Sequence, residues 1–393
     1  MKETTSFVFT GDVSFDKYMD HKWTDPELVD KKLRDICLSA DHLAVNVEGP
    51  FCIPEENAAG EGVNALKHSM SPDAAVFLKK LGADIFNICN NHIMDAGEKG
   101  IADTLKIAHD MDVMTVGAGM SINEASSPLF FDEAGGIGLL SVGYERACRK
   151  ATADAPGCLN FSDMDIVKEK IRQIKEKCRW CVVIAHDGEE FTALPSPYTR
   201  QRFRDYLDMG ADIVVAHHPH VPMNYENVGE KVIFYSLGNF IFDTDYQRSQ
   251  KNTEKGIFIK IDFTNESFDF EPYGILIDRK KQRICLSDLP DIFENVNDAE
   301  YQKLIPLSAK MFLENTKRQQ KYLFPDKYIN ATEKDWYDNF YEPMRSGRVP
   351  KKLLDLQIIY PLAKEADNGE WKKSSLSKVR DFILEQIPDE GKA

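Results

Sequence analysis

Short apolar runs alternate with segments of helical spacing along about the first 270 residues of the chain. Runs rich in Val, Ile and Phe predict buried strands, whereas apolar residues recurring every three or four positions predict helices. The expected strands, several with the loop that follows, are SFVFTGD (6–12), HLAVNVEG (42–49), ADIFNICNNH (83–92), DVMTVGAG (112–119), GIGLLSVG (136–143), RWCVVIAHDGEE (179–190), ADIVVAHHPH (211–220), KVIFYSLGNFIFD (231–243) and GIFIKIDF (256–263). The expected helices lie at 27–39, 72–81, 98–110, 163–178 and 198–209.

This alternation is typical of a layered α/β fold, in which helices cover the strands. From about residue 288 the chain becomes richer in charged residues, Tyr and Trp, and it lacks compact apolar runs. We therefore expect an α/β domain over residues 1–287 and a mostly helical extension over residues 288–393. Residues 50–70 are rich in Pro, Gly, Glu and Asn, which predicts a long loop within the first domain.

The formal net charge of −15 argues against nucleic acid as a partner, because no basic field would offset phosphate repulsion. The same net charge is compatible with an anionic small-molecule or polymer substrate, since bound cations can reverse the local sign of the charge. The first residues run straight into a strand pattern, and no stretch of about 18 apolar residues predicts a membrane span. The eight scattered cysteines suggest reduced thiols, so we expect a cytoplasmic protein.

Polar residues that can bind metal follow five of the predicted strands. The carboxyl ends of strands are where ligand sites form in open α/β sheets, so these residues should converge. Carboxylate, imidazole and amide oxygen together suit divalent ions such as Mn, Fe or Zn. The residues concerned are Asp12, Glu48, Asn91, His92, His186, His218 and His220.

Each of these residues also has a simpler interpretation. Asp12 or Asn91 alone is more often a turn residue, and His186 alone could be a core histidine with its hydrogen bonds satisfied. A single His-x-His is a metal site in a minority of cases. The coincidence of polar residues at five strand ends nevertheless favours a metal site.

The stretch VVAHHPH (214–220) holds three of the nine histidines of the chain. Alternate residues of an extended segment point to the same side, so His218 and His220 are expected to act together. Pro219 should favour an extended conformation at His218. His217 would then point away, and we do not expect it to be a ligand.

Several motifs in order resemble the CapA family, which is named for poly-γ-glutamate capsule synthesis, within the calcineurin-like metallophosphoesterase superfamily. The resemblance covers about residues 5 to 245 and implies a four-layer α/β/β/α sandwich with a dinuclear metal site. The motifs are GDVSFD (11–16), NVEGPF (46–51), NNHIMDAG (90–97), TVGAGMSINEASSP (115–128), AHDGEE (185–190), VVAHHPHV (214–221) and FYSLGNFIFD (234–243).

The resemblance also implies roles for the ligands. Glu48 would bridge two divalent ions, and Asp12 and His220 would complete the first site. The superfamily usually has a His two positions after the first Asp, where this chain has Ser14. The second ion is therefore more certain than the first. Its implied ligands are Asn91, His186 and His218.

Four further residues concern the substrate. His92 resembles the superfamily residue that faces the substrate as a general acid. Asp95 either orients His92 or caps the following helix, and the sequence favours neither. Asn239 reaches the substrate or closes a turn, and Lys67 binds an anionic group or is a solvated loop charge.

The leading functional hypothesis is metal-dependent phosphoester hydrolysis in capsule or surface-polymer metabolism. A hydroxide bridging the ions would attack phosphorus. A second hypothesis is hydrolysis or transfer at γ-glutamyl amides, polarised by the same ions. A third is a non-catalytic, metal-binding component of a polymer-assembly complex. Fold-level resemblance alone cannot choose among these hypotheses.

Overall fold

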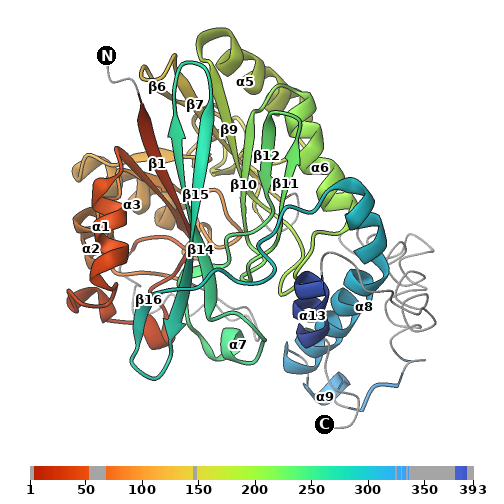
Figure 1. Cartoon of the computed structure of the whole chain (residues 1–393). Coiled ribbons are helices and arrows are strands. Elements are labelled where there is room, and N and C mark those ends of the chain that lie inside the picture. Colours follow the sequence, from red (N-terminus) through yellow and green to blue (C-terminus); the bar gives the residue numbers. More distant parts are fainter. Residues whose placement is uncertain are drawn as a thin grey trace.

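Two β-sheets form the centre of the computed structural model, which describes residues 4–52, 68–144, 148–323, 325–328, 330–332, 335 and 377–386 (Figure 1). The first sheet has the order β16 (Arg283–Ser287), β15 (Phe268–Asp278), β14 (Lys255–Phe263), β1 (Thr5–Val13), β2 (His42–Val47), β3 (Ile85–Asn87) and β4 (Met114–Val116), with β13 (Asn239–Ile241) beside β1. The second has the order β11 (Tyr225–Val228), β12 (Lys231–Phe234), β10 (Ile213–His217), β9 (Trp180–His186), β7 (Ile137–Gly143) and β6 (Leu129–Phe131). A small separate pair consists of β5 (Ala118–Gly119) and β8 (Gly157–Cys158).

Three apolar clusters define four layers. One lies between the sheets and joins residues of β1 and β14 to residues of β9, β10 and β12. The second packs α1 (Lys31–Ser39), α2 (Pro72–Lys80) and α3 (Gly97–Asp110) on the first sheet. The third packs α5 (Met164–Lys177) and α6 (Pro197–Asp208) on the second sheet. The predicted α/β/β/α sandwich is therefore confirmed.

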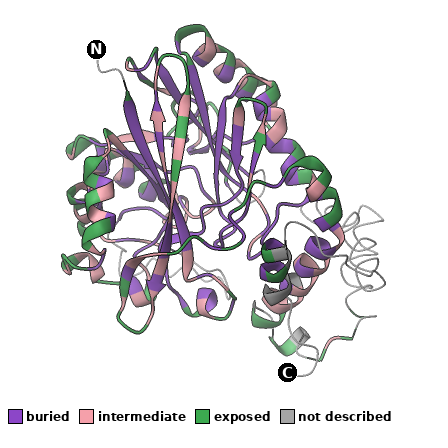
Figure 2. Ribbon diagram, in the orientation of Figure 1, coloured by how far each residue is buried: buried purple, intermediate pink, exposed green. Residues whose placement is uncertain are grey.

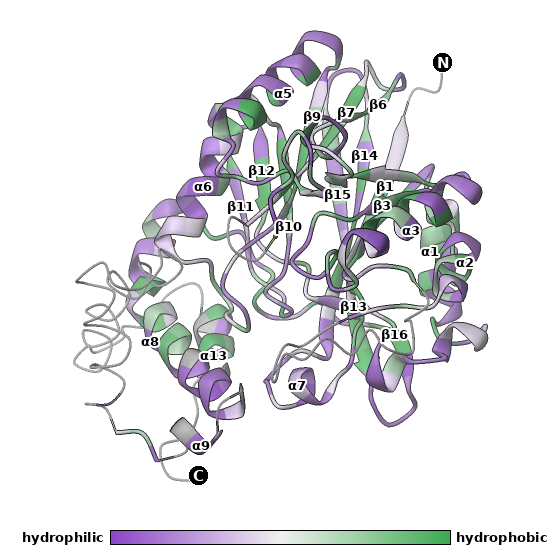
Figure 3. Ribbon diagram, turned by 180° about the vertical axis from the view of Figure 1, so that it is seen from behind, coloured by the Kyte–Doolittle hydropathy of each residue, from purple (hydrophilic) through white to green (hydrophobic). Residues whose placement is uncertain are grey.

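Strand β1 shows why the sheets can be stacked in this way. All nine of its residues are buried, including the polar ones toward both ends of the strand. Phe7 and Phe9 point into the core between the sheets, whereas Val8 and Val13 belong to the core under the helices. Successive side chains of a strand point to opposite faces, so one strand contributes to both cores. Figure 2 shows most strands buried, with partly exposed positions along β15, and the outward helix faces exposed. Figure 3 shows hydrophilic stretches along α5 and α6.

Local signals set the helix starts. The Ser71 side chain accepts a hydrogen bond from the Asp73 backbone, and Pro72 is the first residue of α2, as predicted. Helix α1 begins at Lys31 and not at residue 27. Its N-cap is Asp30, whose side chain accepts a hydrogen bond from the Leu33 backbone.

The segment 231–243 forms two strands, not the single strand that its apolar run predicted. β12 pairs with β10 in the second sheet, whereas β13 pairs with β1 in the first. The chain crosses between the sheets at Gly238, which has a φ of 66° and packs tightly against Pro222. This left-handed conformation favours glycine. The crossing carries Asn239 to the junction of the two sheets.

The described part of residues 288–393 is mostly helical, with α8 (Asp298–Leu323), α9 (Pro325–Tyr328) and α13 (Ser377–Gln386), and residues 288–297 form a non-helical connection after β16. Apolar residues of α8 and α13 pack with Ala193 and Leu194, which follow β9. Shorter helices elsewhere are η1 (Lys17–Met19), η2 (Lys22–Thr24), α4 (Ile122–Ala125) and α7 (Asp245–Arg248). Within the described ranges, no helix is both long and apolar enough to cross a membrane. Strand β16 ends at Ser287, but the domain division at 287/288 stays a prediction.

Candidate metal centre

Five side chains from the two sheets converge where parallel strands end. Asp12 lies near the end of β1 and Glu48 directly follows β2, in the first sheet. His186 ends β9, and His218 and His220 follow β10, in the second sheet. The gathering at carboxyl strand ends is the arrangement that the sequence predicted.

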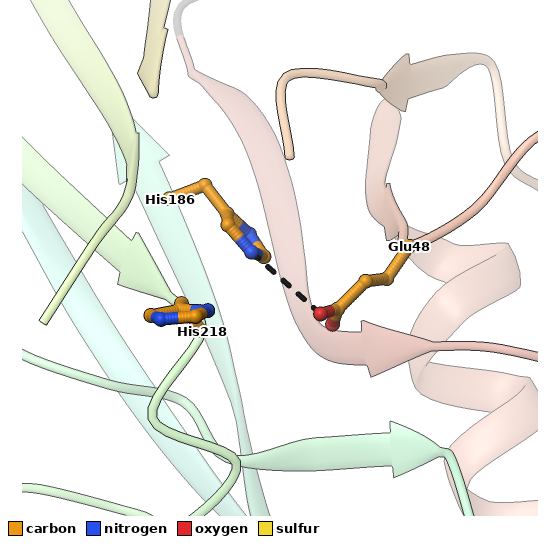
Figure 4. A group of neighbouring side chains, drawn as sticks. All are labelled: Glu48, His186 and His218. Atoms are coloured by element: carbon orange, nitrogen blue, oxygen red, sulfur yellow. Dashed lines mark ion pairs between the residues drawn. The ribbon is translucent and has the colours of Figure 1, made fainter. Parts of the chain in front are cut away.

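Glu48 lies between two groups of possible ligands. One group is Glu48, His186 and His218, the other is Asp12, Glu48 and His220, and the ligand atoms within each lie within 4.8 Å of one another. The Oε1 atom of Glu48 is 3.6 Å from Nε2 of His186 and 3.5 Å from Nε2 of His220. Figure 4 shows the ring of His186 directed at the Glu48 carboxylate, with His218 beside them. A carboxylate shared in this way can bridge two cations.

Burial shifts the pKa values of the ionisable groups in this centre. It raises the pKa of Glu48 well above its ordinary value, and neither carboxylate oxygen of Glu48 has a hydrogen-bond partner among the described residues. Burial, together with the nearby His218, lowers the pKa of His186 well below its usual range. Burial also lowers the pKa of His220, but the Glu48 and Asp12 carboxylates outweigh it and raise this pKa to about 10. A buried carboxylate without a partner is costly, so the donor set fits a bound cation.

Asp12 is held by a chain of amide side chains that the sequence reading missed. Asn46 Nδ2 donates to Asp12 Oδ1 at 2.7 Å, and Asn87 Nδ2 donates to Asn46 Oδ1 at 2.6 Å. Ser141 of the second sheet then donates to Asn87 Oδ1 at 2.6 Å. Such bonds orient a metal ligand through its neighbours. Asn46 and Asn87 are polar residues within otherwise apolar strands, and this pattern in the sequence could have identified them as functional.

The HHPH stretch is not extended, so that prediction was wrong. His218 has a φ of 97° and His220 a φ of 58°, both in the left-handed region that side chains other than glycine rarely occupy. A tight turn around Pro219, not strand alternation, brings both rings toward Glu48. His217 is the last residue of β10, and its Nε2 lies 2.8 Å from the Thr10 carbonyl oxygen, outside both ligand groups.

Asn91 and His92 lie in the loop after β3. Asn91 Oδ1 is 2.8 Å from His186 Nε2, so Asn91 lies beside the second ligand group. The Nδ1 of His92 is 2.7 Å from Asp95 Oδ2. Ala96, not Asp95, is the N-cap residue of α3, and no side chain caps that helix. The structure therefore brings Asp95 to His92 and not to the helix start.

His68 is a second histidine that lies next to the His92–Asp95 pair. Its backbone N–H donates to Asp95 Oδ2 at 2.6 Å, and its ring lies edge-on to His92 with centroids 4.3 Å apart. Its Nδ1 is 3.0 Å from Asp16 Oδ2. His68 thus fixes Asp95 and one side of His92. Lys67, predicted to contact substrate, lies outside the described residues.

Asn239 contacts the centre from the first sheet. Its Oδ1 is 3.0 Å from Nδ1 of His220, and its amide nitrogen donates to Gln247 and to the Thr253 carbonyl. The side chain is fully buried and lies against the His220 ring. Ser14, at the position of the missing histidine, is also buried, and its hydroxyl has no hydrogen-bond partner in the described part of the chain.

The fold and this site together define a two-sheet α/β protein with a candidate dinuclear metal centre. The chain matches the family model described as "Bacterial capsule synthesis protein PGA_cap" over residues 6–244. This match covers more than half of the chain, and the protein belongs to that family. The predicted CapA resemblance is thereby confirmed.

Two relatives show how far this similarity extends. The chain is 29% identical over 279 residues to "PGA biosynthesis protein CapA" of Bacillus subtilis, covering 70% of this chain and 72% of that protein. It is 30% identical over 219 residues to "Capsule biosynthesis protein CapA" of Bacillus anthracis, covering 54% of this chain and 53% of that protein. The match thus spans about half the length of the second relative.

Solved structures resemble the chain more distantly. A 5'-nucleotidase from Candida albicans is 12% identical with a TM-score of 0.39, covering 71% of this chain and 53% of that one. Purple acid phosphatase PPD1 from yellow lupin is 11% identical with a TM-score of 0.37, covering 74% of this chain and 55% of that one. Similarity at this level carries no argument about function.

Proposed function

We propose that this protein is a metal-dependent hydrolase of phosphoesters that acts in capsule or surface-polymer metabolism. The observation that carries the proposal is Glu48, a buried carboxylate that belongs to two ligand groups and has no hydrogen bond to any described residue. When bound, a pair of divalent ions such as Mn, Fe or Zn would supply polarisation of a phosphoryl oxygen and activation of water.

The proposed ligands divide between two ions. Glu48 would contact both, as a carboxylate with two oxygens can. The first ion would be held by Asp12 and His220, and no further His, Cys, Asp or Glu of the described residues joins this group, where the superfamily has a histidine at the position of Ser14. The second ion would be held by Asn91, His186 and His218.

His92 is the proposed general acid. Its Nδ1 is engaged by Asp95, so Nε2 is the nitrogen left to face a substrate. The ring is 15% exposed, which leaves it accessible at the edge of an otherwise buried centre. A proton held at Nε2 could pass to the departing oxygen, and Asp95 would orient the ring and stabilise its positive charge before that transfer. Lys67 remains a proposed substrate contact, whereas Asn239, predicted as another, is buried and is proposed instead to hold the His220 ring in place.

The link to capsule polymer rests on the family and on the names of the two Bacillus relatives. A polymer-derived anionic substrate fits such a centre, because bound cations would offset its charge. We also propose a cytosolic location, supported by the eight free cysteines. Cell fractionation with an antibody against the chain would test it, and recovery outside the cytosolic fraction would contradict it.

The test of the proposed function combines metal content with turnover. The full chain is loaded with Mn, Fe or Zn and assayed on phosphomonoesters, phosphodiesters and γ-linked glutamate oligomers. We expect metal-dependent phosphoester turnover that His218→Ala abolishes. Release of glutamate without phosphoester turnover would replace the proposal by the amide alternative. Metal binding without any turnover would favour a non-catalytic component of an assembly complex.

A further inference from the structure

Glu190 lies at the rim of the proposed second metal site, although it belongs to neither ligand group. It follows β9 by four positions, in the motif AHDGEE. Its Oε1 is 3.9 Å from Nε2 of His218, which is too long for a hydrogen bond. The side chain is 27% exposed, so the carboxylate faces both the centre and solvent.

The C-terminal helix α8 holds this carboxylate in place. Gln319 Nε2 donates to Glu190 Oε2 at 2.8 Å. One turn earlier on α8, Asn315 donates to the carbonyl oxygen of Phe191. The Phe191 ring stacks on His220, with centroids 5.9 Å apart and planes at 26°. Helix α8 lies beyond the matched residues 6–244, yet it supports the loop that borders both ligand groups.

No charged side chain in the described part of the chain lies within hydrogen-bonding distance of the Glu190 carboxylate. Among the described residues no lysine or arginine pairs with it, and its close contacts are Gln319, His218 and Tyr246. The neighbouring Glu189 differs, because it is buried and accepts hydrogen bonds from Ser196 and Thr199. Glu189 is thus a structural residue, whereas Glu190 keeps a charged oxygen directed at the space beside His218.

We infer that Glu190 is a specificity-determining residue that binds a cationic group, such as a primary ammonium, on the substrate beside the bond to be cleaved. The inference rests on the proposed function and deepens it by naming the substrate class. A carboxylate fixed at this rim repels additional negative charge and stabilises a nearby ammonium through a charge-assisted hydrogen bond. Gln319 positions the Glu190 carboxylate. The C-terminal extension therefore contributes to this selectivity.

Two phosphodiesters that differ by one charge test the inference: 2-aminoethyl 4-nitrophenyl phosphate and ethyl 4-nitrophenyl phosphate. We measure the ratio of their kcat/KM values for the Mn-loaded full chain. The wild type should prefer the aminoethyl diester, and Glu190→Gln should reduce that preference about 10- to 100-fold, the range for a hydrogen bond to a charged group. Gln319→Ala should reduce it by a smaller factor.

The controls are Glu230→Gln, which changes an exposed glutamate, and Gln320→Ala, which changes the next residue of α8. Both should keep the wild-type ratio, and Glu190→Gln should keep its metal content because Glu190 belongs to neither ligand group. A ratio near one in the wild type, or the same ratio in Glu190→Gln, would overturn the inference.

If neither diester is hydrolysed, the proposed phosphoester activity fails, but the role of Glu190 can still be decided. Calorimetry on the Mn-loaded chain then gives the Kd of both diesters. Tighter binding of the aminoethyl diester that Glu190→Gln removes supports the inference. Equal binding of the two diesters by the wild type overturns it.

Discussion

The Oδ2 atom of Asp95 lies 2.7 Å from Nδ1 of His92, so the two side chains form a carboxylate–imidazole pair next to the candidate metal centre. Because neither residue belongs to a ligand group, we expect His92→Ala to keep its metal while kcat falls about 10²- to 10⁴-fold. Asp95→Asn should lower kcat about 10- to 100-fold, because it removes the carboxylate that orients the His92 ring.

Steady-state kinetics on the phosphodiester with metal analysis of the same samples would check this prediction. His109→Ala, a change of an exposed histidine at the end of α3, is the control. Retention of wild-type kcat in His92→Ala would remove His92 from the mechanism. Loss of metal in that variant would mean that His92 acts as a ligand instead.

The HHPH stretch offers a matched pair of histidine variants for the metal site. His218→Ala removes a proposed ligand of the second ion, so we expect about one ion fewer per chain. His217→Gln should keep the full content, because glutamine can preserve the contact with the Thr10 carbonyl oxygen. Plasma mass spectrometry of Mn- or Zn-loaded samples gives the number of metal ions per chain in both variants. Equal metal content in the two variants would contradict the ligand assignment.

A buried ion pair fastens the start of α8 to the second sheet. Glu226 accepts hydrogen bonds from Arg200, Arg204 and Tyr235, and Arg200 also donates to Asp298 of α8 at 2.8 Å. Breaking a buried pair by removing one charge typically costs about 3–5 kcal/mol. We therefore expect Glu226→Gln to lower the free energy of unfolding by about that amount.

Urea unfolding followed by circular dichroism would measure the effect of this change. Glu230→Gln, an exposed glutamate in the turn between β11 and β12, should change stability little. A loss of less than about 1 kcal/mol in Glu226→Gln would show that the pair contributes no more than an exposed one.

His68 should make stability depend on pH. Burial lowers its pKa below the ordinary value of 6.5, although the hydrogen bond to Asp16 opposes this shift. Below about pH 6.5 the unfolded chain takes up a proton at His68 that the folded chain does not, so the free energy of unfolding falls until the folded pKa is reached. We expect metal-free wild type to lose stability in this window, and His68→Gln to lose less. Urea unfolding from pH 8 to pH 5 tests this, with His109→Gln as the control.

The sequence by itself determined the layers and the family. Apolar runs and helical spacing are local signals of burial, so they identified β1, β9 and β10 and the helices between the strands, within a few residues at the ends. The motifs that follow these strands are contiguous, so they could be read without knowing how the chain folds. Because strand ends converge in such sheets, even the candidate ligands could be named in advance.

Only the tertiary structure decided how those residues meet. The left-handed backbone at His218, the crossing of the chain at Gly238 and the amide chain through Asn46 depend on contacts between segments that lie far apart in the sequence. The contact of Gln319 with Glu190 joins residues 129 positions apart. Local patterns report which side of an element is buried, but they carry no information about which distant side chain fills the space opposite. That choice is made by packing, and it brought Glu190 and α8 to the candidate metal centre.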